Sequence, residues 1–373
     1  MPVWAGTYSY VSFCFAAHPD DWQLFMGNRA CNDMSDPNNK KVVIIHLTSG
    51  DATYDGVSLN LPYYQSREKG AQNSLEFCAD LQSYHDNGTY SIKTIAGHKI
   101  RKYSYKNVVD YFFRLPDGCF KTGFNNESVE YLNKGKIEKI RAIDSSATYT
   151  NWDDLVNTVR TLILEESASI PEVWINTNDP DNNFNPGDHP DHVYTALLAK
   201  DAISNLDYIN RNVFQGYNIS NLPQNISIDD VILKTGAFAS ADFGLTQNNT
   251  RSNFEKSHLS FIPRTYFRTY ISKADSFMNN VTTVSTGVTG NYCMVYPVPA
   301  VDVIYINYYV LATGHVDIEI TEAGGKRVKT FLSEKQSNGA YTLTENINSL
   351  HPGVYFITIN TNMYSNRLKI VKE

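Results

Sequence analysis

The sequence predicts an α/β domain built on a mostly parallel sheet with helices on both faces, followed by a small C-terminal all-β sandwich. Three observations support this: continuous apolar runs of strand length, helical patterns between those runs, and a change to short alternating segments near the C-terminus. The chain has 373 residues, which exceeds the size at which one hydrophobic core usually stops growing, so we expect two domains.

Three apolar runs are rich in β-branched and aromatic residues and are bounded by polar loops: 10–17, 40–51 and 171–177. Such runs suit strands that are buried on both faces of a parallel sheet. Helical patterns accompany them at 21–30, 63–84 and 150–169. Thr150 and Asp153 have the spacing of a capping box and mark the start of the third helix. This alternation predicts right-handed crossovers, with ligands bound at the carboxyl edge of the sheet.

The last part of the chain has a different pattern. Residues 279–292 are poor in charge and rich in Thr, Gly and Val, as in a linker or a loosely held strand. We therefore predict a first domain at 1–284 and a second at 285–373. Short alternating segments separated by Gly- and Asn-containing turns follow the linker, and no helical pattern interrupts them. They predict a β-sandwich.

Composition excludes several classes of protein. The net charge is −7 without a basic block, so we do not expect a nucleic-acid partner. Five scattered cysteines without a CxxC pair exclude a zinc ribbon or a dense disulfide framework, and at least one stays unpaired within the chain. No apolar run approaches the roughly 20 residues of a transmembrane helix. The start lacks a basic region, so we expect any export signal to have been removed.

Two distant turns carry matching ionisable residues. "HPDD" at 18–21 follows the first apolar run, and "HPDH" at 189–192 follows the third, and each opens a helical pattern. Because parallel strands end at one edge of a sheet, these side chains can converge. His18, Asp21 and His192 then supply two imidazoles and one carboxylate, the ligand number of a catalytic zinc with an open position for water.

The remaining members of the two turns suit roles beside the metal. Asp20 is adjacent to a ligand without being needed as one, and such a carboxylate can act as the general base for a metal-activated water, whose pKa falls to about 7. His189 can face the other side of a bound carbonyl and stabilise an oxyanion or protonate a leaving amine. A single HxxD or HxxH motif is usually only a helix cap or a surface pair, so Asp20 as an N-cap and His189 as a structural histidine remain alternatives. The occurrence of two such motifs, each at the end of a strand, favours a metal site.

The sequence at this point resembles the PIG-L or LmbE-like metal-dependent de-N-acetylases. The paired HPD motifs carry the resemblance, supported by "VVIIHLTSGDATYDG" at 42–56, "SREKGAQNSLEF" at 66–77 and "FRLPDG" at 113–118. The resemblance covers about residues 8–205. It implies a Rossmann-like sheet, removal of acetyl from N-acetylglucosaminyl groups and related amides, and the same metal ligands, with Asp20 as base and His189 as its electrostatic or acid partner.

The resemblance also assigns Arg67 and Asp117 to positions near the sugar, although each is also compatible with a plain helix-face or turn residue. The family usually has a Glu after the two aspartates, where this chain has Trp22. Residues 206–278 fit the family pattern poorly, and we expect them to complete the fold, wall the pocket and determine substrate choice.

The tail resembles the C-terminal sorting domain of the type IX secretion system. "VYPVPAVDVIYI", "EAGGKRVKT", "LHPGVYFITI" and the closing "RLKIVKE" carry this resemblance, although Val298 replaces the usual Asn. It implies the type IX secretion machinery as a partner and a secreted or cell-surface protein of a Bacteroidetes-type bacterium. A plain interaction or sugar-binding module is the alternative.

We therefore predict a secreted, zinc-dependent N-deacetylase, a hydrolase of linear amides, that acts on an amino sugar or glycoconjugate, with Fe²⁺ as the other candidate metal. Two alternatives remain. The same ligands could form the facial triad of a non-haem iron oxygenase, or the protein could bind glycans through a degenerate site.

Overall fold

The computed structural model describes residues 8–51, 60–119, 126–206, 208–270, 283–286, 293–310, 313–337, 339–361 and 365–373. The chain divides into two compact units, Met1–Phe267 and Arg268–Glu373. The predicted boundary between residues 284 and 285 stays a prediction, because most of the linker at 279–292 lies outside the described residues.

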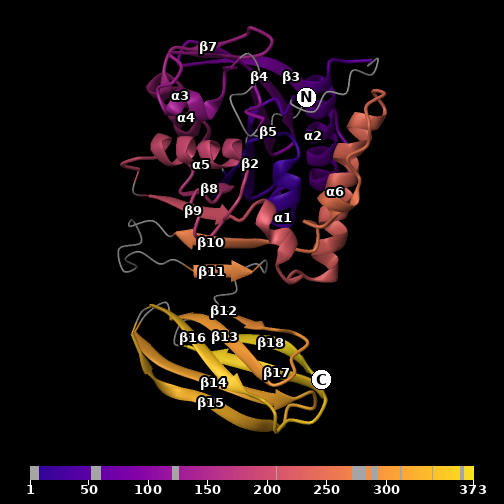
Figure 1. Ribbon diagram of the computed structural model, residues 1–373, viewed down its shortest axis with the longest axis vertical. Helices are drawn as coiled ribbons and strands as arrows, with labels where there is room; N and C mark the ends of the chain where they lie inside the picture. The colour runs from indigo at the N-terminus through magenta and orange to yellow at the C-terminus, as the bar shows by residue number, and fades with distance from the viewer. Residues whose placement is uncertain are drawn as a thin grey trace. The chain divides into compact units, whose positions relative to one another are not determined.

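The elements up to β10 are labelled in Figure 1 where there is room. The strands are β1 (Tyr10–Ala16), β2 (Lys40–Thr48), β3 (Thr89–Ile95), β4 (His98–Tyr105), β5 (Val108–Leu115), β6 (Ile140–Arg141), β7 (Thr148–Tyr149), β8 (Glu172–Asn178), β9 (Ile209–Phe214) and β10 (Tyr266–Tyr270). The helices are the π-helix η1 (Trp22–Met26), α1 (Gly27–Met34), α2 (Tyr63–Asp80), α3 (Val129–Asn133), α4 (Trp152–Glu166), α5 (Pro190–Ala202), the 3₁₀ helix η3 (Tyr217–Asn221), α6 (Ile228–Thr246) and α7 (Lys256–Leu259).

The central sheet is mostly parallel, as predicted. Eight of its strands follow the order β10-β9-β8-β1-β2-β5-β4-β3. β1 pairs in parallel with both β2 and β8, and the parallel pairing continues from β2 to β5 and from β8 to β9. Within this sheet, β4 pairs antiparallel with both β3 and β5. The predicted strands at 10–17, 40–51 and 171–177 are therefore three adjacent strands in the middle of the sheet.

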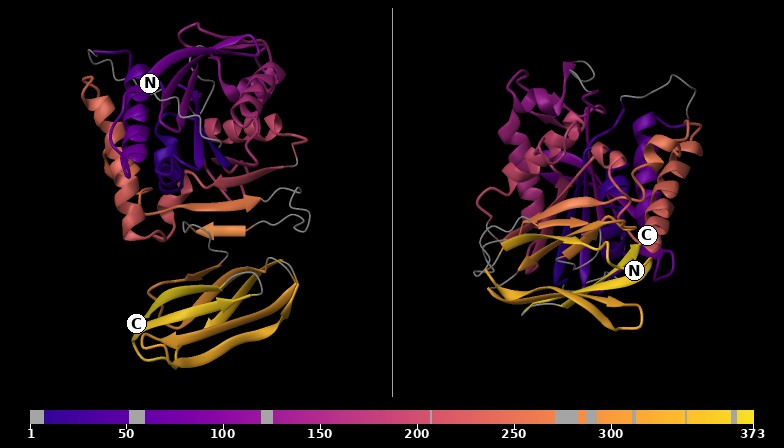
Figure 2. Two further views of the ribbon diagram at one scale, coloured as in Figure 1. Left: turned by 180° about the vertical axis from the view of Figure 1, so that it is seen from behind. Right: turned by 60° about the horizontal axis from the view of Figure 1, so that its bottom comes forward.

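Helices cover both faces of this sheet because the side chains of β1 alternate between two cores. Phe13 and Phe15 face a core that includes residues of α3, α4 and α5, whereas Cys14 and Ala16 face a core that includes residues of η1, α1, α2 and α6. The ribbon views show the same two layers (Figures 1 and 2). Full burial of a phenylalanine side chain contributes roughly 1.5–3 kcal/mol, so the continuous apolar runs stabilise a strand that is covered on both sides.

The start of α4 differs from the predicted capping box by one residue. The N-cap is Asn151, whose side chain accepts a hydrogen bond from the Asp154 backbone N–H. Thr150 donates from its backbone N–H and its hydroxyl to the Asp154 carboxylate, at 2.8 and 3.1 Å. The reciprocal contact thus involves Asp154 and not Asp153, because an Asn at the N-cap satisfies the same backbone donors as a Thr.

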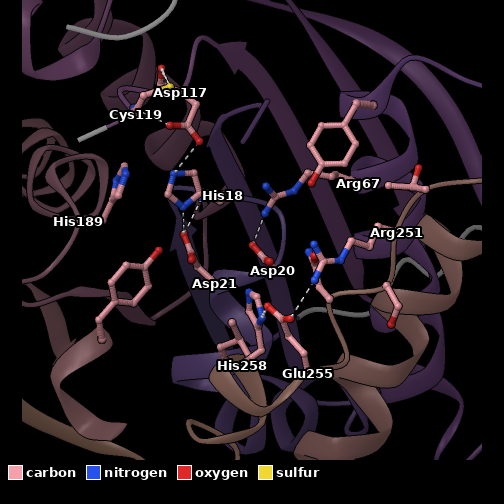
Figure 3. Close-up of a pocket in the computed structure, with 16 residues that line it drawn as sticks. His18, Asp20, Asp21, Arg67, Asp117, Cys119, His189, Arg251, Glu255 and His258 are labelled. Atoms are coloured by element: carbon pink, nitrogen blue, oxygen red, sulfur yellow. Dashed lines mark hydrogen bonds and ion pairs between the residues drawn. The ribbon is translucent and has the colours of Figure 1, made fainter. Parts of the chain in front are cut away.

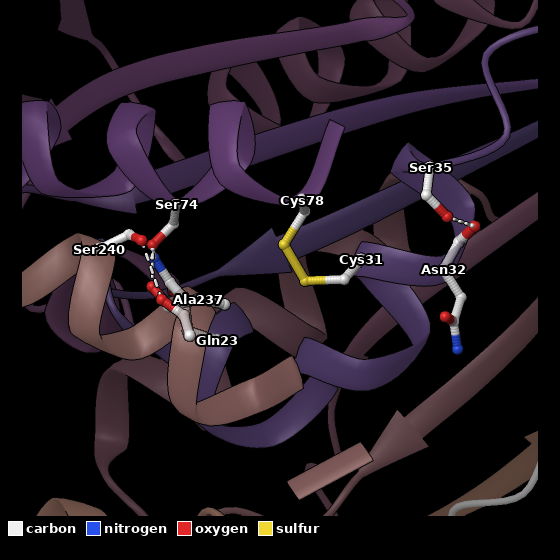
Figure 4. Close-up of a disulfide and its surroundings, with 9 residues drawn as sticks. Gln23, Cys31, Asn32, Ser35, Ser74, Cys78, Ala237 and Ser240 are labelled. Carbon is white, nitrogen blue, oxygen red and sulfur yellow. Dashed lines mark hydrogen bonds between the residues drawn. A yellow bond between two sulfur atoms is a disulfide. The ribbon is translucent and has the colours of Figure 1, made fainter. Parts of the chain in front are cut away.

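Two close contacts hold α2 in place. A disulfide between Cys31 and Cys78 joins α1 to α2, as Figure 4 shows, while Cys14 and Cys119 are free thiols. On α6, a Cβ atom added to Gly244 would lie 2.4 Å from the Cα of Gly70 on α2. The two helices can approach this closely only because both residues lack a side chain.

The second unit contains strands only, among its described residues. After β11 (Thr283–Thr286), they are β12 (Cys293–Tyr296), β13 (Val303–Val310), β14 (Gly314–Glu322), β15 (Arg327–Gln336), β16 (Gly339–Asn346), β17 (Gly353–Asn360) and β18 (Ser365–Lys372). They form antiparallel sheets in the orders β12-β13-β16 and β15-β14-β17-β18. Ile304 and Ile306 of one sheet share a core with Ile318 and Ile357 of the other, which confirms the predicted sandwich. None of the helices in the described ranges combines the length and apolar character needed to cross a bilayer.

Candidate metal centre

The two predicted motifs lie at the same edge of the sheet. His18, Asp20 and Asp21 follow the end of β1, and His189 is the N-cap of α5, with Pro190 at the first helical position. β1 and β8 are parallel neighbours, so the turn after β1 and the connection from β8 to α5 begin side by side. Pro at the first helical position has no N–H to lose there and fixes the direction of α5.

The structure brings His18, Asp21 and His192 together. The Asp21 carboxylate lies between the imidazoles, with Oδ2 3.2 Å from His18 Nδ1 and Oδ1 3.1 Å from His192 Nε2. The two ring centroids are 5.3 Å apart, and one donor atom from each of the three residues lies within 4.8 Å of the others. The backbone N–H of His18 also donates to Asp21 Oδ2 at 2.6 Å, which fixes the carboxylate relative to the end of β1.

Each imidazole has a carboxylate on its other nitrogen. His192 Nδ1 lies 2.8 Å from Asp188, and His18 Nε2 lies 3.3 Å from Asp191 and 3.4 Å from Asp117. Such a carboxylate fixes the tautomer and ring orientation of a metal-binding histidine. We call these three carboxylates, together with His18, Asp21 and His192, the histidine–aspartate cluster. Asp188 and Asp191 were not among the site residues predicted from the sequence. Asp188 directly precedes the HPDH motif, and Asp191 is its third residue.

Glycines allow two of these carboxylates to pack against the backbone. Gly118 donates its N–H to Asp191 at 2.8 Å, and a Cβ atom added there would lie 2.6 Å from Asp191 Oδ1. A Cβ atom added to Gly216 would lie 2.2 Å from Asp188 Oδ1. The Gly of "FRLPDG" is therefore required by the close approach of Asp191.

The charges of the cluster shift the pKa values of its members. Burial opposes the charged form of His192, but Asp188 and Asp21 raise its pKa to about 10. Burial likewise opposes the charge of His18, yet Asp21 and Asp191 raise its pKa well above the usual value. The pKa of Asp21 is held well below its usual value against the effect of burial by the charges of His192 and His18. The cluster therefore concentrates negative charge around both imidazoles, as a cation site requires.

His189 has a different environment from the other two histidines. Burial and the charge of His18 lower its pKa to about 4, so this imidazole is neutral at pH 7. Its Nδ1 accepts a hydrogen bond from the Asp191 backbone N–H at 3.1 Å. The proton of the neutral ring is therefore on Nε2. His189 can donate a hydrogen bond without being protonated first, and it caps α5 at the same time.

Asp20 and Arg67 form an ion pair beside the cluster. Arg67 also donates to the carbonyl oxygen of Gly50 at 2.6 Å, and a Cβ atom on Gly50, which has a φ of +58°, would meet the guanidinium. The predicted sugar-binding arginine thus positions Asp20. Asp20 is not a member of the groups of potential metal ligands found among the described residues, and its role as general base stays a prediction.

A cavity of about 520 Å³ opens onto this site. It is lined by the predicted residues His18, Asp20, Asp21, Arg67, Asp117 and His189 (Figure 3). Tyr217 and residues between Thr250 and His258 also line it and belong to the stretch 206–278 that was expected to wall the pocket, although no residue there was named in advance. Tyr63 and Cys119 line it as well and were not anticipated from the sequence. Trp22, where the family usually has Glu, is fully buried in the core that contains α2 and α6 and does not line the cavity.

Comparison with known proteins is consistent with this geometry. The sequence model of the GlcNAc-PI de-N-acetylases matches residues 13–203, more than half of the chain. That of the secretion system C-terminal sorting domain matches residues 294–373. No curated protein sequence matches the chain at a significant level.

Several solved structures are distantly similar. The zinc-inhibited form of the teicoplanin deacetylase Orf2 is 13% identical, with 65% of this chain and 87% of that chain covered and a TM-score of 0.37. The N,N'-diacetylchitobiose deacetylase of Pyrococcus horikoshii is 16% identical, with coverage of 62% and 69% and a TM-score of 0.34. The 4-carboxy-2-hydroxymuconate hydratase of Pseudomonas putida is 10% identical, with coverage of 68% and 82% and a TM-score of 0.36. Structural similarities with TM-scores this low do not identify the activity of this chain.

The family assignment therefore rests on the match to the sequence model of the GlcNAc-PI de-N-acetylases. The matched range begins within β1 and ends just after α5, so it includes both turns that carry the HPD motifs. The chain belongs to the GlcNAc-PI de-N-acetylase family and is a de-N-acetylase, with a secretion-system sorting domain at its C-terminal end.

Proposed function

We propose that the protein is an exported, zinc-dependent hydrolase that removes the N-acetyl group from an amino sugar or a glycoconjugate. The observation that carries the proposal is the convergence of the buried His18, Asp21 and His192 donor atoms beside a cavity that His18 and Asp21 line, with Asp20 in the same lining but outside the ligand set.

The donor set fits a divalent cation. His18, Asp21 and His192 offer two ring nitrogens and a carboxylate, all buried, and carboxylates behind both rings orient them. This set of three protein ligands is typical of catalytic zinc and leaves a position open, although Fe²⁺ suits the same donors. A cation bound there supplies Lewis acidity, which polarises an acetamido carbonyl and lowers the pKa of a water molecule to about 7.

The residues of the chain handle the protons of the reaction. Asp20, held by Arg67, accepts a proton from water as the water oxygen attacks the acetyl carbon. His189 donates its Nε2–H to the carbonyl oxygen as negative charge develops there. The C–N bond then breaks, the proton held by Asp20 passes to the departing nitrogen, and the products are the free amine and acetate.

The cavity suits a sugar. Tyr63 and Tyr217 contribute aromatic rings to its lining, and Tyr217 stacks on Phe261 at a centroid distance of 5.8 Å. Aromatic side chains offer flat apolar faces with a polar tip, which match the alternating C–H and hydroxyl surfaces of a pyranose.

The sorting domain supports export. Its match at residues 294–373 indicates a secreted or cell-surface protein, and we assign the route to type IX secretion. The Cys31–Cys78 disulfide is consistent with an oxidising compartment.

The experiment is acetate release from N-acetylglucosamine and its β-1,4-linked oligomers by the zinc-loaded full chain. A chelator should abolish the rate and Zn²⁺ should restore it. Asp20→Asn should lower kcat by about 10²–10⁴-fold with bound zinc retained, whereas His192→Ala should lose both activity and zinc. Full activity in either variant would refute the assignment.

A further inference from the structure

One wall of the cavity comes from a segment that the family model does not cover. Residues Thr250, Arg251, Ser252, Asn253, Glu255 and His258 line the cavity together with His18 and Asp20. They follow α6 and lie well beyond residue 203, where the family match ends. We call residues 250–258 the α6–α7 wall. Figure 3 shows Arg251, Glu255 and His258 together on the side of the cavity away from Asp117 and Cys119.

The backbone of this wall is anchored to α6 by one buried carboxylate. Asp242 accepts hydrogen bonds from the Ser252 hydroxyl at 2.7 Å and from the Asn253 backbone N–H at 2.6 Å. The Ser252 oxygen in turn accepts from the Phe254 N–H at 3.0 Å. Asp242 is only 8% exposed, so these bonds are shielded from water and fix the position of the segment beside the cavity.

The side chains on this anchored backbone are loosely paired. Arg251 Nη2 lies 3.5 Å from Glu255 Oε2, and His258 Nδ1 lies 3.7 Å from Glu255 Oε1. The side chain of Arg251 is 79% exposed and that of Glu255 48%. The Thr250 hydroxyl is buried and has no hydrogen-bond partner among the described residues. Glu255 Oε1 also accepts a hydrogen bond from the Ser257 hydroxyl at 3.0 Å. The wall thus offers guanidinium donors, a second carboxylate oxygen and the Thr250 hydroxyl to a ligand.

These groups have the chemistry that recognises neutral hydroxyls. A sugar hydroxyl both donates and accepts, and adjacent Arg and Glu side chains can satisfy both roles at once. The carboxylate of Glu255 offsets the charge of Arg251, which disfavours an anionic occupant. A cavity of about 520 Å³ is also within the range that accommodates a ligand much larger than an acetamido group.

We infer that Arg251, Glu255 and His258 form an outer subsite that binds the hydroxyl groups of a second sugar unit attached to the acetylated one. The inference rests on the proposed function and extends it: the histidine–aspartate cluster performs the hydrolysis, and the α6–α7 wall selects oligomers over monosaccharides. Asp242 is then a positioning residue, since it acts through the backbone of the wall.

The test compares kcat/KM for N-acetylglucosamine with that for its β-1,4-linked dimer, using the zinc-loaded full chain. Wild type should prefer the dimer. Arg251→Ala should reduce this preference about tenfold, the effect of one charge-assisted hydrogen bond, and the loss should appear in KM rather than kcat. Glu255→Gln should reduce it in the same direction, as should Asp242→Asn, which removes the anchor.

Lys256→Ala is the matched control. Lys256 is an exposed cation of the same segment that does not line the cavity, so its removal should leave the preference unchanged. An unchanged preference in both Arg251→Ala and Glu255→Gln overturns the subsite, while turnover by wild type leaves the proposed function in place.

Dimer binding to the Asp20→Asn background, measured by calorimetry, separates the two proposals. If wild type releases no acetate from either substrate, the deacetylase proposal fails for these sugars. The subsite is then decided by binding alone: weaker dimer binding after Arg251→Ala supports it, and equal affinity or no binding in both proteins overturns it.

Discussion

The histidine–aspartate cluster and the α6–α7 wall differ in how their charged side chains are paired. In the histidine–aspartate cluster, each imidazole is buried between carboxylates, as His192 is between Asp21 and Asp188. In the α6–α7 wall, Arg251 and Glu255 are exposed and approach no closer than 3.5 Å. The first arrangement holds donor atoms in fixed positions, which catalysis needs. The second leaves the guanidinium of Arg251 exposed to a ligand, so we expect the first part to serve catalysis and the second to serve substrate selection.

The largest effect on stability should come from the disulfide that joins α1 to α2. Cys31 and Cys78 are separated by 47 residues, and a cross-link over a loop of this length stabilises a fold by about 4 kcal/mol in the chain-entropy description. We expect the variant Cys31→Ser with Cys78→Ser to lower the free energy of unfolding by a similar amount. Urea titrations of both proteins measure the difference, with reduced wild type as a second comparison. A loss below about 1 kcal/mol would show that packing, and not the cross-link, holds α1 against α2.

A buried ion-pair network on the other face of the sheet should give a pH-dependent loss of stability. Burial alone would raise the pKa of Glu166, but Lys41, Tyr111 and Lys93 lower it to about 2. The folded state therefore binds fewer protons than the unfolded state between about pH 2 and 4.5, and stability falls as the pH drops through that window. The contribution of Glu166 to the free energy of unfolding is at most about 3 kcal/mol. Glu166→Gln should reduce the loss of stability between pH 5 and pH 3 in urea titrations, and an identical loss in the variant would contradict the expectation.

A smaller effect, on metal affinity, should follow from replacing one carboxylate of the cluster by an amide. Asp188→Asn keeps the shape of the side chain but weakens its contact with His192 Nδ1. Loss of such a partner typically lowers metal affinity by 10–100-fold, roughly 1.4–2.7 kcal/mol. Competition with a zinc-binding dye measures the affinity. Unchanged affinity would mean that α5 alone fixes the ring of His192.

The smallest effect should be that of Arg251→Ala on stability. Exposed ion pairs at i, i+4 contribute at most about 0.5 kcal/mol, so we expect the urea midpoint to remain within error of wild type. This result would sharpen the contrast with Glu166, because Arg251 would then matter for substrate preference and not for folding. A loss above about 1 kcal/mol would show that the wall is a structural element.

The sequence was sufficient for the parts of the structure that depend on local patterns. Continuous apolar runs indicated β1, β2 and β8, since strands covered on both faces need no polar alternation. The two HPD motifs indicated one site because parallel neighbours end at one edge. The shift of the α4 cap from Thr150 to Asn151 reflects two adjacent residues that can both serve as caps.

Other parts depend on contacts between distant segments and were not predictable. The pairing of Cys31 with Cys78 requires α1 to lie beside α2, and nothing in the spacing of five cysteines shows this. Tyr217 and Arg251 enter the cavity from a stretch without a recognisable motif. The position of Arg251, which follows α6, depends on the close crossing of α6 over α2 at Gly244 and Gly70, which is a property of the packed fold.

That crossing has a consequence for how the enzyme can be changed. The helix that carries Arg67 and the helix that precedes the α6–α7 wall meet backbone against backbone at Gly70 and Gly244, and the Ser74 hydroxyl joins the same two helices by donating to the Ala237 carbonyl. Residues 247–258 could therefore be replaced without moving α2 or α6. Such a replacement could change the substrate specificity while the hydrolytic residues keep their positions.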